Sequence, residues 1–106
     1  MQAAVFLDRD NTIILNDGHL GDPGAVQLMD GVADSIGRLD AAGLPVIVIT
    51  NQSGVARGLF DEDDVRAVHR RIEGCLEEEI ARPGIIRAWY FCPWHPDASV
   101  RAYRGD

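Results

Sequence analysis

The sequence contains no lysine, so all ten of its basic residues are arginines, set against 17 acidic residues. The resulting formal charge of -7 repels polyanions at long range. This charge argues against nucleic-acid binding through general electrostatics. Any anionic ligand must therefore be held by local groups.

Cysteines and long apolar runs are also scarce. Cys75 and Cys92 are too few for a disulfide framework, and the amino terminus meets Asp8 after a short apolar run, unlike a signal peptide or a membrane span. We therefore expect a cytoplasmic chain with no membrane partner. A length of 106 residues with 46% hydrophobic residues fits one compact domain, residues 1–106.

Three apolar runs rich in branched or aromatic residues predict strands at residues 3–7, 44–50 and 85–92. The second is an unbroken branched run after a proline, which is typical of a central parallel strand covered on both faces. Between the first two strands, residues 16–31 are crowded with Gly, Asp and Pro and predict a loop without a core element.

Two helices are expected between the strands. Apolar residues at helical spacing predict a helix over residues 31–42, with Gly43 at its left-handed stop. Asp61 and Asp64 predict a capping box at the start of a second helix, which ends before Pro83. The alternation of strands and helices predicts an α/β fold, the first three strands and two helices of a doubly wound, Rossmann-like parallel sheet.

Two aspartates directly follow the first predicted strand. If the backbone stays extended, Asp8 and Asp10 leave on the same side and Arg9 is turned away. Their mutual repulsion is relieved by a divalent cation, and Mg²⁺ suits carboxylates that share it with phosphate oxygens. One carboxylate can then attack phosphorus while the other transfers a proton. The alternative is that both merely cap a turn.

A second polar stretch, TNQSGVARG at residues 50–58, follows the second predicted strand. Hydroxyl, amide and backbone N–H groups of this kind form a concave set of donors for phosphate oxygens, and Thr12 adds a hydroxyl after the aspartate pair. Arg57 is either a further phosphate contact or a solvated surface charge. Alone, the stretch could be a turn before a helix, but the ends of adjacent parallel strands lie side by side. The combination predicts a phosphate site.

The motif Asp8-Arg9-Asp10-Asn11-Thr12, followed by Thr50 at the end of the next strand, resembles the haloacid dehalogenase-like phosphatases. The resemblance implies that Asp8 is the nucleophile and Asp10 the general acid and base. It also implies that Mg²⁺ is held by the Asp8 side chain and the Asp10 carbonyl, and that Thr50 steadies the phosphoryl group.

FLDRD, TNQSGVARG and a C-P-x-H-P segment together look like the branch of D,D-heptose 1,7-bisphosphate 7-phosphatases and histidinol phosphatases. That branch implies a small phosphorylated substrate such as D-glycero-D-manno-heptose 1,7-bisphosphate, with histidinol phosphate as the alternative. The resemblance places these residues at the substrate: Asn51, Gln52, Ser53, Gly18 and His19.

The chain departs from this family in two ways. The family's later cationic residue and later acidic pair are missing, with only Arg101 and Arg104 after the third strand. We therefore expect the C-terminal part of the domain to be missing and the chain alone to turn over slowly or not at all. Trp94 stands where the branch has a zinc-binding histidine, so we expect no zinc, with Cys92 a thiol at a strand end and His95 a loop histidine.

Other interpretations stay open. The chain could be a non-catalytic phosphate-binding module, or a receiver domain, although receivers place the phospho-accepting aspartate after the third strand, where this chain has YFCPWHP. We expect His69 to face solvent and Trp89, Tyr90 and Phe91 to serve strand packing. A sheet of three strands leaves an edge and one face open, which predicts self-association.

Overall fold

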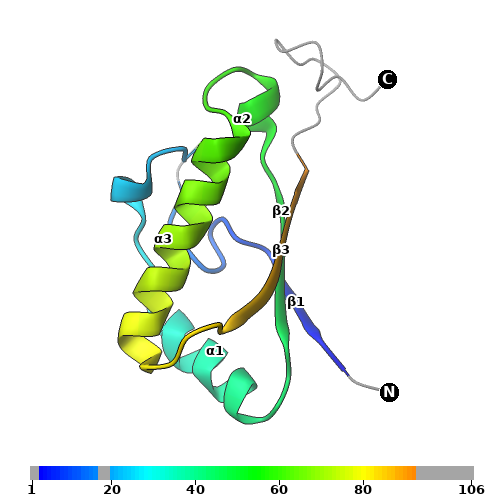
Figure 1. Ribbon diagram of the computed structural model, residues 1–106, viewed down its shortest axis with the longest axis vertical. Helices are drawn as coiled ribbons and strands as arrows, with labels where there is room; N and C mark the ends of the chain where they lie inside the picture. The colour runs from blue at the N-terminus through cyan, green and yellow to red at the C-terminus, as the bar shows by residue number, and fades with distance from the viewer. Residues whose placement is uncertain (1–2, 17–19, 93–106) are drawn as a thin grey trace.

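The computed structural model describes residues 3–16 and 20–92. Strands β1 (Val5–Leu7), β2 (Val46–Asn51) and β3 (Ile86–Cys92) form a parallel sheet with β2 in the centre (Figure 1). Val46 pairs with Val5 on one side and with Ile86 on the other. The three predicted parallel strands are confirmed.

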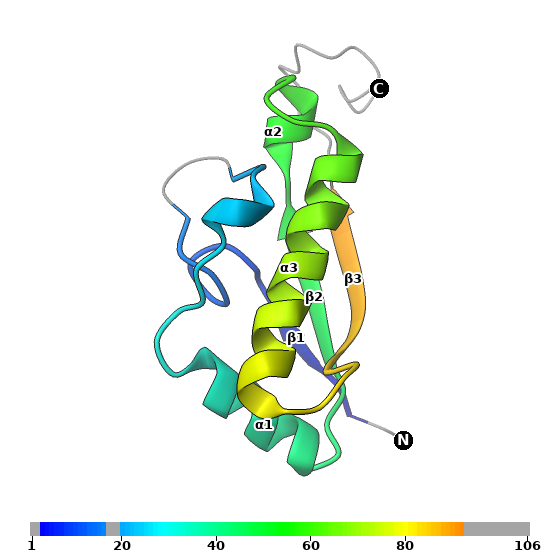
Figure 2. The same cartoon turned by 60° about the vertical axis from the view of Figure 1, so that its left-hand side comes forward.

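Helices α1 (Val32–Ala41) and α3 (Glu62–Ile80) make the two crossovers and lie on the same face of the sheet (Figures 1 and 2). Right-handed crossovers that proceed in one direction, from β1 to β2 to β3, put both helices on one side. The expectation that residues 44–50 are covered on both faces is therefore wrong for the described residues, where Ile49 is 48% exposed.

The uncovered face of the sheet carries large apolar side chains. Phe6 is 61% exposed and Tyr90 60%, and Tyr90 pairs in register with Ile49. Of the aromatic residues predicted to serve strand packing, Trp89 packs against the core, whereas Tyr90 lies on the uncovered face. Self-association through this face and the β3 edge stays a prediction. Light scattering can test it by measuring the molar mass in solution at several protein concentrations.

The helix ends agree with the sequence signals. The Asp64 N–H donates to Asp61 Oδ1 at 2.8 Å and the Asp61 N–H to Asp64 Oδ2 at 2.9 Å, so the predicted capping box is confirmed. Gly43 has a φ of 77° after α1, and Ala81 has a φ of 63° where α3 ends. Each helix therefore stops through a left-handed residue.

The loop before α1 contributes more to the core than its composition suggested. It contains the 3₁₀ helix η1 (Pro23–Ala25), and four of its side chains pack partly buried against the core: Leu20, Val26, Leu28 and Met29. The expectation of a loop without a core element is wrong in this respect. A further short helix, α2 (Ser53–Ala56), follows β2.

The segment after β1 is anchored by the core. Ile13 and Ile14 are fully buried, and Ile14 bridges both Asp10 and Leu28. The Ile13 N–H donates to the Arg9 carbonyl at 2.8 Å. These contacts fix the turn that carries the aspartate motif. No helix in the described part of the chain is both long and apolar enough to span a membrane.

Candidate active site at the carboxyl ends of β1 and β2

The site forms where β1 and β2 end side by side. Asp10 Oδ2 accepts a hydrogen bond from Gln52 Nε2 at 3.0 Å and lies 3.5 Å from the Thr50 hydroxyl, which donates to it. Gln52 Nε2 also donates to Thr50 Oγ1 at 2.8 Å. The structure thus brings Asp10 of the first motif together with Thr50 and Gln52 of the stretch TNQSGVARG. Asp8 is exposed and directly follows the last residue of β1.

Alternation along β2 explains why Thr50 reaches this cluster. The buried positions of the strand are Val46, Val48 and Thr50, which share the helix-covered face. Asn51 is exposed and on the opposite side, so the structure does not bring it to Asp10. Gln52 is 3% exposed, because the chain turns back toward Asp10 after the strand.

Arg9 is not turned away from the aspartates, which corrects the prediction. It is fully buried, and its Nη2 lies 2.8 Å from Asp10 Oδ1 and donates to Gln52 Oε1 at 3.0 Å. Strand alternation fails here because β1 ends at Leu7 and the backbone then turns, with Asn11 at a φ of 58°.

The prediction that His69 faces solvent is also wrong. His69 is only 5% exposed, its Nε2 lies 3.3 Å from Arg9 Nη1, and its ring stacks on Trp89 at a centroid separation of 4.1 Å. The signal was available in the sequence, since His69 stands four residues after Val65 and three before Ile72 on the buried stripe of α3.

Burial sets the charge states of this pair. It lowers the pKa of His69 to about 3, with the positive charge of Arg9 adding to the shift and Asp10 opposing it. Burial also lowers the pKa of Arg9, against the ion pair with Asp10, yet a guanidinium stays protonated in proteins. Neutral His69 can therefore accept a hydrogen bond from charged Arg9.

The remaining predicted site residues are placed as follows. Thr12 and Arg57 are exposed, and Ser53 begins α2. Gly18 and His19 lie outside the described residues, as do Trp94 and His95, so the zinc expectation stays a prediction. Among the described residues, no three His, Cys, Asp or Glu side chains group closely enough to hold a metal ion by themselves.

A glycine of the loop before η1 and a glycine of α2 both lie against the Phe60 ring. A Cβ built on Gly54, in the TNQSG stretch, would lie 2.4 Å from the Phe60 ring, and one on Gly21 would lie 2.6 Å from it. The ring therefore joins the loop before η1 to α2. Larger residues at either position would push these two segments apart.

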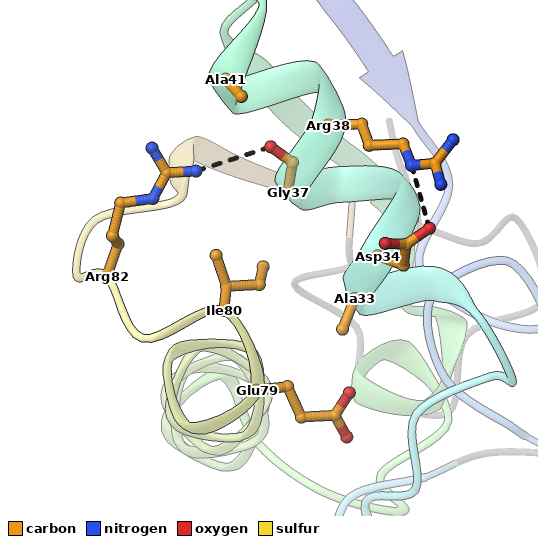
Figure 3. A pocket seen from close by; sticks show the side chains of 8 residues that line it. All are labelled: Ala33, Asp34, Gly37, Arg38, Ala41, Glu79, Ile80 and Arg82. Atoms are coloured by element: carbon orange, nitrogen blue, oxygen red, sulfur yellow. Dashed lines mark hydrogen bonds and ion pairs between the residues drawn. The ribbon is translucent and has the colours of Figure 1, made fainter.

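A cavity of about 370 Å³ lies elsewhere, between α1 and the carboxyl end of α3 (Figure 3). Both arginines that line it are already paired, Arg82 with Asp40 at 2.9 Å and Arg38 with Asp34 at 3.1 Å. It lies at the opposite end of α3 from the end that follows β2 (Figure 1). We therefore do not place the substrate there.

The chain has clear relatives, although no protein-family profile matches it. It is 48% identical over 101 residues to a D-glycero-beta-D-manno-heptose-1,7-bisphosphate 7-phosphatase of Rhodopseudomonas palustris. The aligned region covers 95% of this chain and 54% of that protein. A relative of the same name from Photorhabdus laumondii is 37% identical and is covered to 52%. The chain thus spans about half the length of the curated relatives it matches.

Solved structures agree. A HAD-like phosphatase structure from Mesorhizobium loti superposes with a TM-score of 0.85 at 34% identity, covering 99% of this chain and 49% of that one. The D,D-heptose 1,7-bisphosphate phosphatase of B. bronchiseptica, solved with magnesium and phosphate, gives a TM-score of 0.81 at 32% identity, covering 92% and 54%. By sequence and by fold, nearly the whole chain is similar to about half of a haloacid dehalogenase-like phosphatase.

Proposed function

We propose that this chain carries the nucleophile and proton-transfer half of a magnesium-dependent phosphomonoesterase that acts on a heptose 1,7-bisphosphate. The observation that carries the proposal is the convergence of Asp10, Thr50 and Gln52 at adjacent strand ends, with Asp8 two residues before Asp10 in the sequence. The names of the relatives support the substrate, because heptose bisphosphate phosphatases match nearly the whole chain.

The chemistry follows from two carboxyl groups in different surroundings. The exposed Asp8 carboxylate attacks phosphorus and forms an aspartyl phosphate, while the sugar oxygen leaves with a proton from the Asp10 carboxyl group. Asp10 then takes a proton from the water that attacks the aspartyl phosphate, which releases inorganic phosphate and restores Asp8. The Thr50 hydroxyl steadies the phosphoryl oxygens.

The residues present fit a magnesium ion that is shared with substrate. Mg²⁺ is commonly bound by one or two carboxylates together with phosphate oxygens and waters, so a cluster of three acidic side chains is not required. The Asp10 carboxylate is already engaged by Arg9, Gln52 and Thr50. We therefore assign the Asp8 side chain and the Asp10 backbone carbonyl to the ion, which would neutralise phosphate charge when bound.

The test is phosphate release from heptose 1,7-bisphosphate and from histidinol phosphate, with Mg²⁺ or with EDTA. Each missing electrostatic donor typically lowers the rate by about 100- to 1000-fold, so we expect slow turnover by these 106 residues and faster turnover by a chain extended along its reading frame. We expect Asp8→Asn to abolish turnover and to weaken Mg²⁺ binding measured by calorimetry. The matched control is Asp30→Asn, an exposed aspartate before α1.

Three outcomes would count against the proposal. Unchanged turnover or Mg²⁺ binding in Asp8→Asn would remove Asp8 from the site. Robust hydrolysis by the 106-residue chain would show that the later family motifs are not required. Binding of Mg²⁺ and phosphate without turnover, in the extended chain as well, would instead favour a non-catalytic phosphate-binding module.

A further inference from the structure

All four buried polar residues in the described part of the chain belong to one cluster around Asp10. They are Arg9, Thr50, Gln52 and His69. Thr50 and Gln52 touch Asp10 directly, as does Arg9, whereas His69 reaches it only through Arg9. We propose that Arg9 and His69 are positioning residues that hold the Asp10 carboxylate in one orientation. The catalytic consequence of this inference rests on the proposed function.

Both oxygens of the Asp10 carboxylate are held from different directions. Oδ1 accepts from Arg9 Nε at 2.9 Å and faces Arg9 Nη2 at 2.8 Å, while Oδ2 accepts from Gln52 Nε2 at 3.0 Å. Arg9 Nη2 also donates to Gln52 Oε1 at 3.0 Å, which fixes which end of the Gln52 amide points to Asp10. Arg9, Asp10 and Gln52 thus close a ring of hydrogen bonds that defines one carboxylate orientation.

His69 contacts Arg9 Nη1, the guanidinium nitrogen that takes no part in this ring of hydrogen bonds. Arg9 Nη1 points at His69 Nε2 at 3.3 Å, and the neutral ring can accept there. The imidazole ring of His69 is held by stacking on Trp89. A series of contacts therefore runs from α3 through Arg9 to the carboxylate after β1.

A role in packing alone does not explain these residues well. The buried pair of Arg9 and Asp10 is costly to desolvate, and a fold with an apolar residue of similar volume at both positions is often as stable or more stable. What the apolar residue cannot do is orient a carboxylate. A misplacement of about 1 Å can lower a rate by about 100-fold, so a fixed proton donor has a functional use.

The experiment uses His69→Phe, which keeps the ring that stacks on Trp89 but removes the acceptor for Arg9, and His69→Gln, which keeps an acceptor. Glu73→Ala is the control, because it breaks the Trp89 hydrogen bond without touching Arg9. Side-chain NMR on the 106-residue chain reports the Arg9 Nε–H and the Gln52 amide protons. This readout needs no turnover and therefore decides the positioning even if the proposed function fails.

In His69→Phe we expect about tenfold faster hydrogen exchange at Arg9 Nε–H, the factor that one lost hydrogen bond of ordinary strength would give. The Gln52 amide signals should shift as well, although Gln52 has no described contact with His69. His69→Gln should restore both signals toward wild type, and Glu73→Ala should leave them unchanged. Unaltered Arg9 and Gln52 signals in a folded His69→Phe chain would overturn the proposal, as would a wild-type His69 that carries its proton on Nε2.

Kinetics add a second readout wherever the wild-type chain turns over. A sugar phosphate has a poor leaving group that needs the Asp10 proton, whereas an aryl phosphate such as p-nitrophenyl phosphate does not. We expect His69→Phe to lower kcat about tenfold or more for the sugar phosphate and less than about twofold for the aryl phosphate. Equal losses on both substrates would indicate a merely structural role and contradict the positioning.

Discussion

Two arginine–aspartate pairs of nearly equal length lie in opposite surroundings in this molecule. Arg9 and Asp10 approach to 2.8 Å with side-chain exposures of 0% and 26%, whereas Arg82 and Asp40 approach to 2.9 Å at 48% and 34%. A distance alone therefore says little about the strength of an ion pair. Water screens the second pair and has largely been removed from the first.

The two pairs also differ in what surrounds them. Arg9 has partners in the turn after β1, directly after β2 and in α3, so its donors are distributed over three parts of the fold. Arg82 has one further described contact, a donation to the Gly37 carbonyl at 3.5 Å. The first pair is thus built into the candidate site, while the second borders an open cavity.

The sharpest way to break this comparison is Arg9→Met. Removing one partner of a buried pair leaves the other without compensation, which typically lowers the free energy of unfolding by about 3 kcal/mol or more. We expect that loss in urea unfolding followed by circular dichroism. Arg82→Met is the matched control and should lose less than about 1 kcal/mol. Equal losses in both variants would show that burial does not separate the pairs.

The next effect is a dependence of stability on pH. Because the pKa of His69 falls to about 3 in the folded chain, against about 6.5 when unfolded, only the unfolded state takes up the proton between these values. The stabilisation is complete above pH 6.5 and is lost as pH falls. We expect the free energy of unfolding to drop by about 2 kcal/mol between pH 7 and pH 5.

His69→Phe checks this assignment, because the other histidines are unchanged in it. Its free energy of unfolding should depend on pH less steeply than that of wild type over the same range. Parallel pH profiles for wild type and His69→Phe would show that folding does not lower the pKa of His69.

A smaller effect sharpens the comparison on the exposed side. Asp61 is exposed, yet its carboxylate accepts from the Asp64 N–H at the start of α3. Loss of an N-cap typically lowers the free energy of unfolding by about 1 kcal/mol, which is more than an exposed ion pair contributes. We expect that loss for Asp61→Ala in urea unfolding, with Asp63→Ala as the control on the same helical turn. Equal effects in the two variants would contradict a specific capping role.

The sequence predicted most of the fold because its signals are local. Branched runs, helical spacing and the Asp61 cap act within one element, and the strand ends then bring Asp10 and Thr50 together. The prediction that β2 is covered on both faces failed, because strand composition cannot tell which way the next crossovers run. Helices cover one face of these three strands, and Ile49 lies on the other.

The positions of Arg9 and His69 were missed for different reasons. Arg9 lies beyond the last residue of β1, Leu7, so strand alternation does not apply to it, and the weak turn signal of the flanking aspartates does not say where its side chain goes. His69 was assigned to solvent by residue type, although its spacing along α3 matches Val65 and Ile72. A polar residue that has the sequence spacing of the buried residues in a helix can belong to a buried hydrogen-bond network. The sequence does not show its partners, because they come from other elements of the fold.

The smallest effect concerns the exposed pair itself. A double-mutant cycle on Arg82→Ala and Asp40→Ala should give a coupling of about 0.5 kcal/mol in low salt, because both side chains must be ordered while water screens their attraction. The coupling should shrink further in 1 M salt, where the Debye length is about 3 Å. A coupling above about 2 kcal/mol that survives high salt would place Arg82 and Asp40 in the same class as Arg9 and Asp10, and exposure would then no longer explain why the two pairs differ.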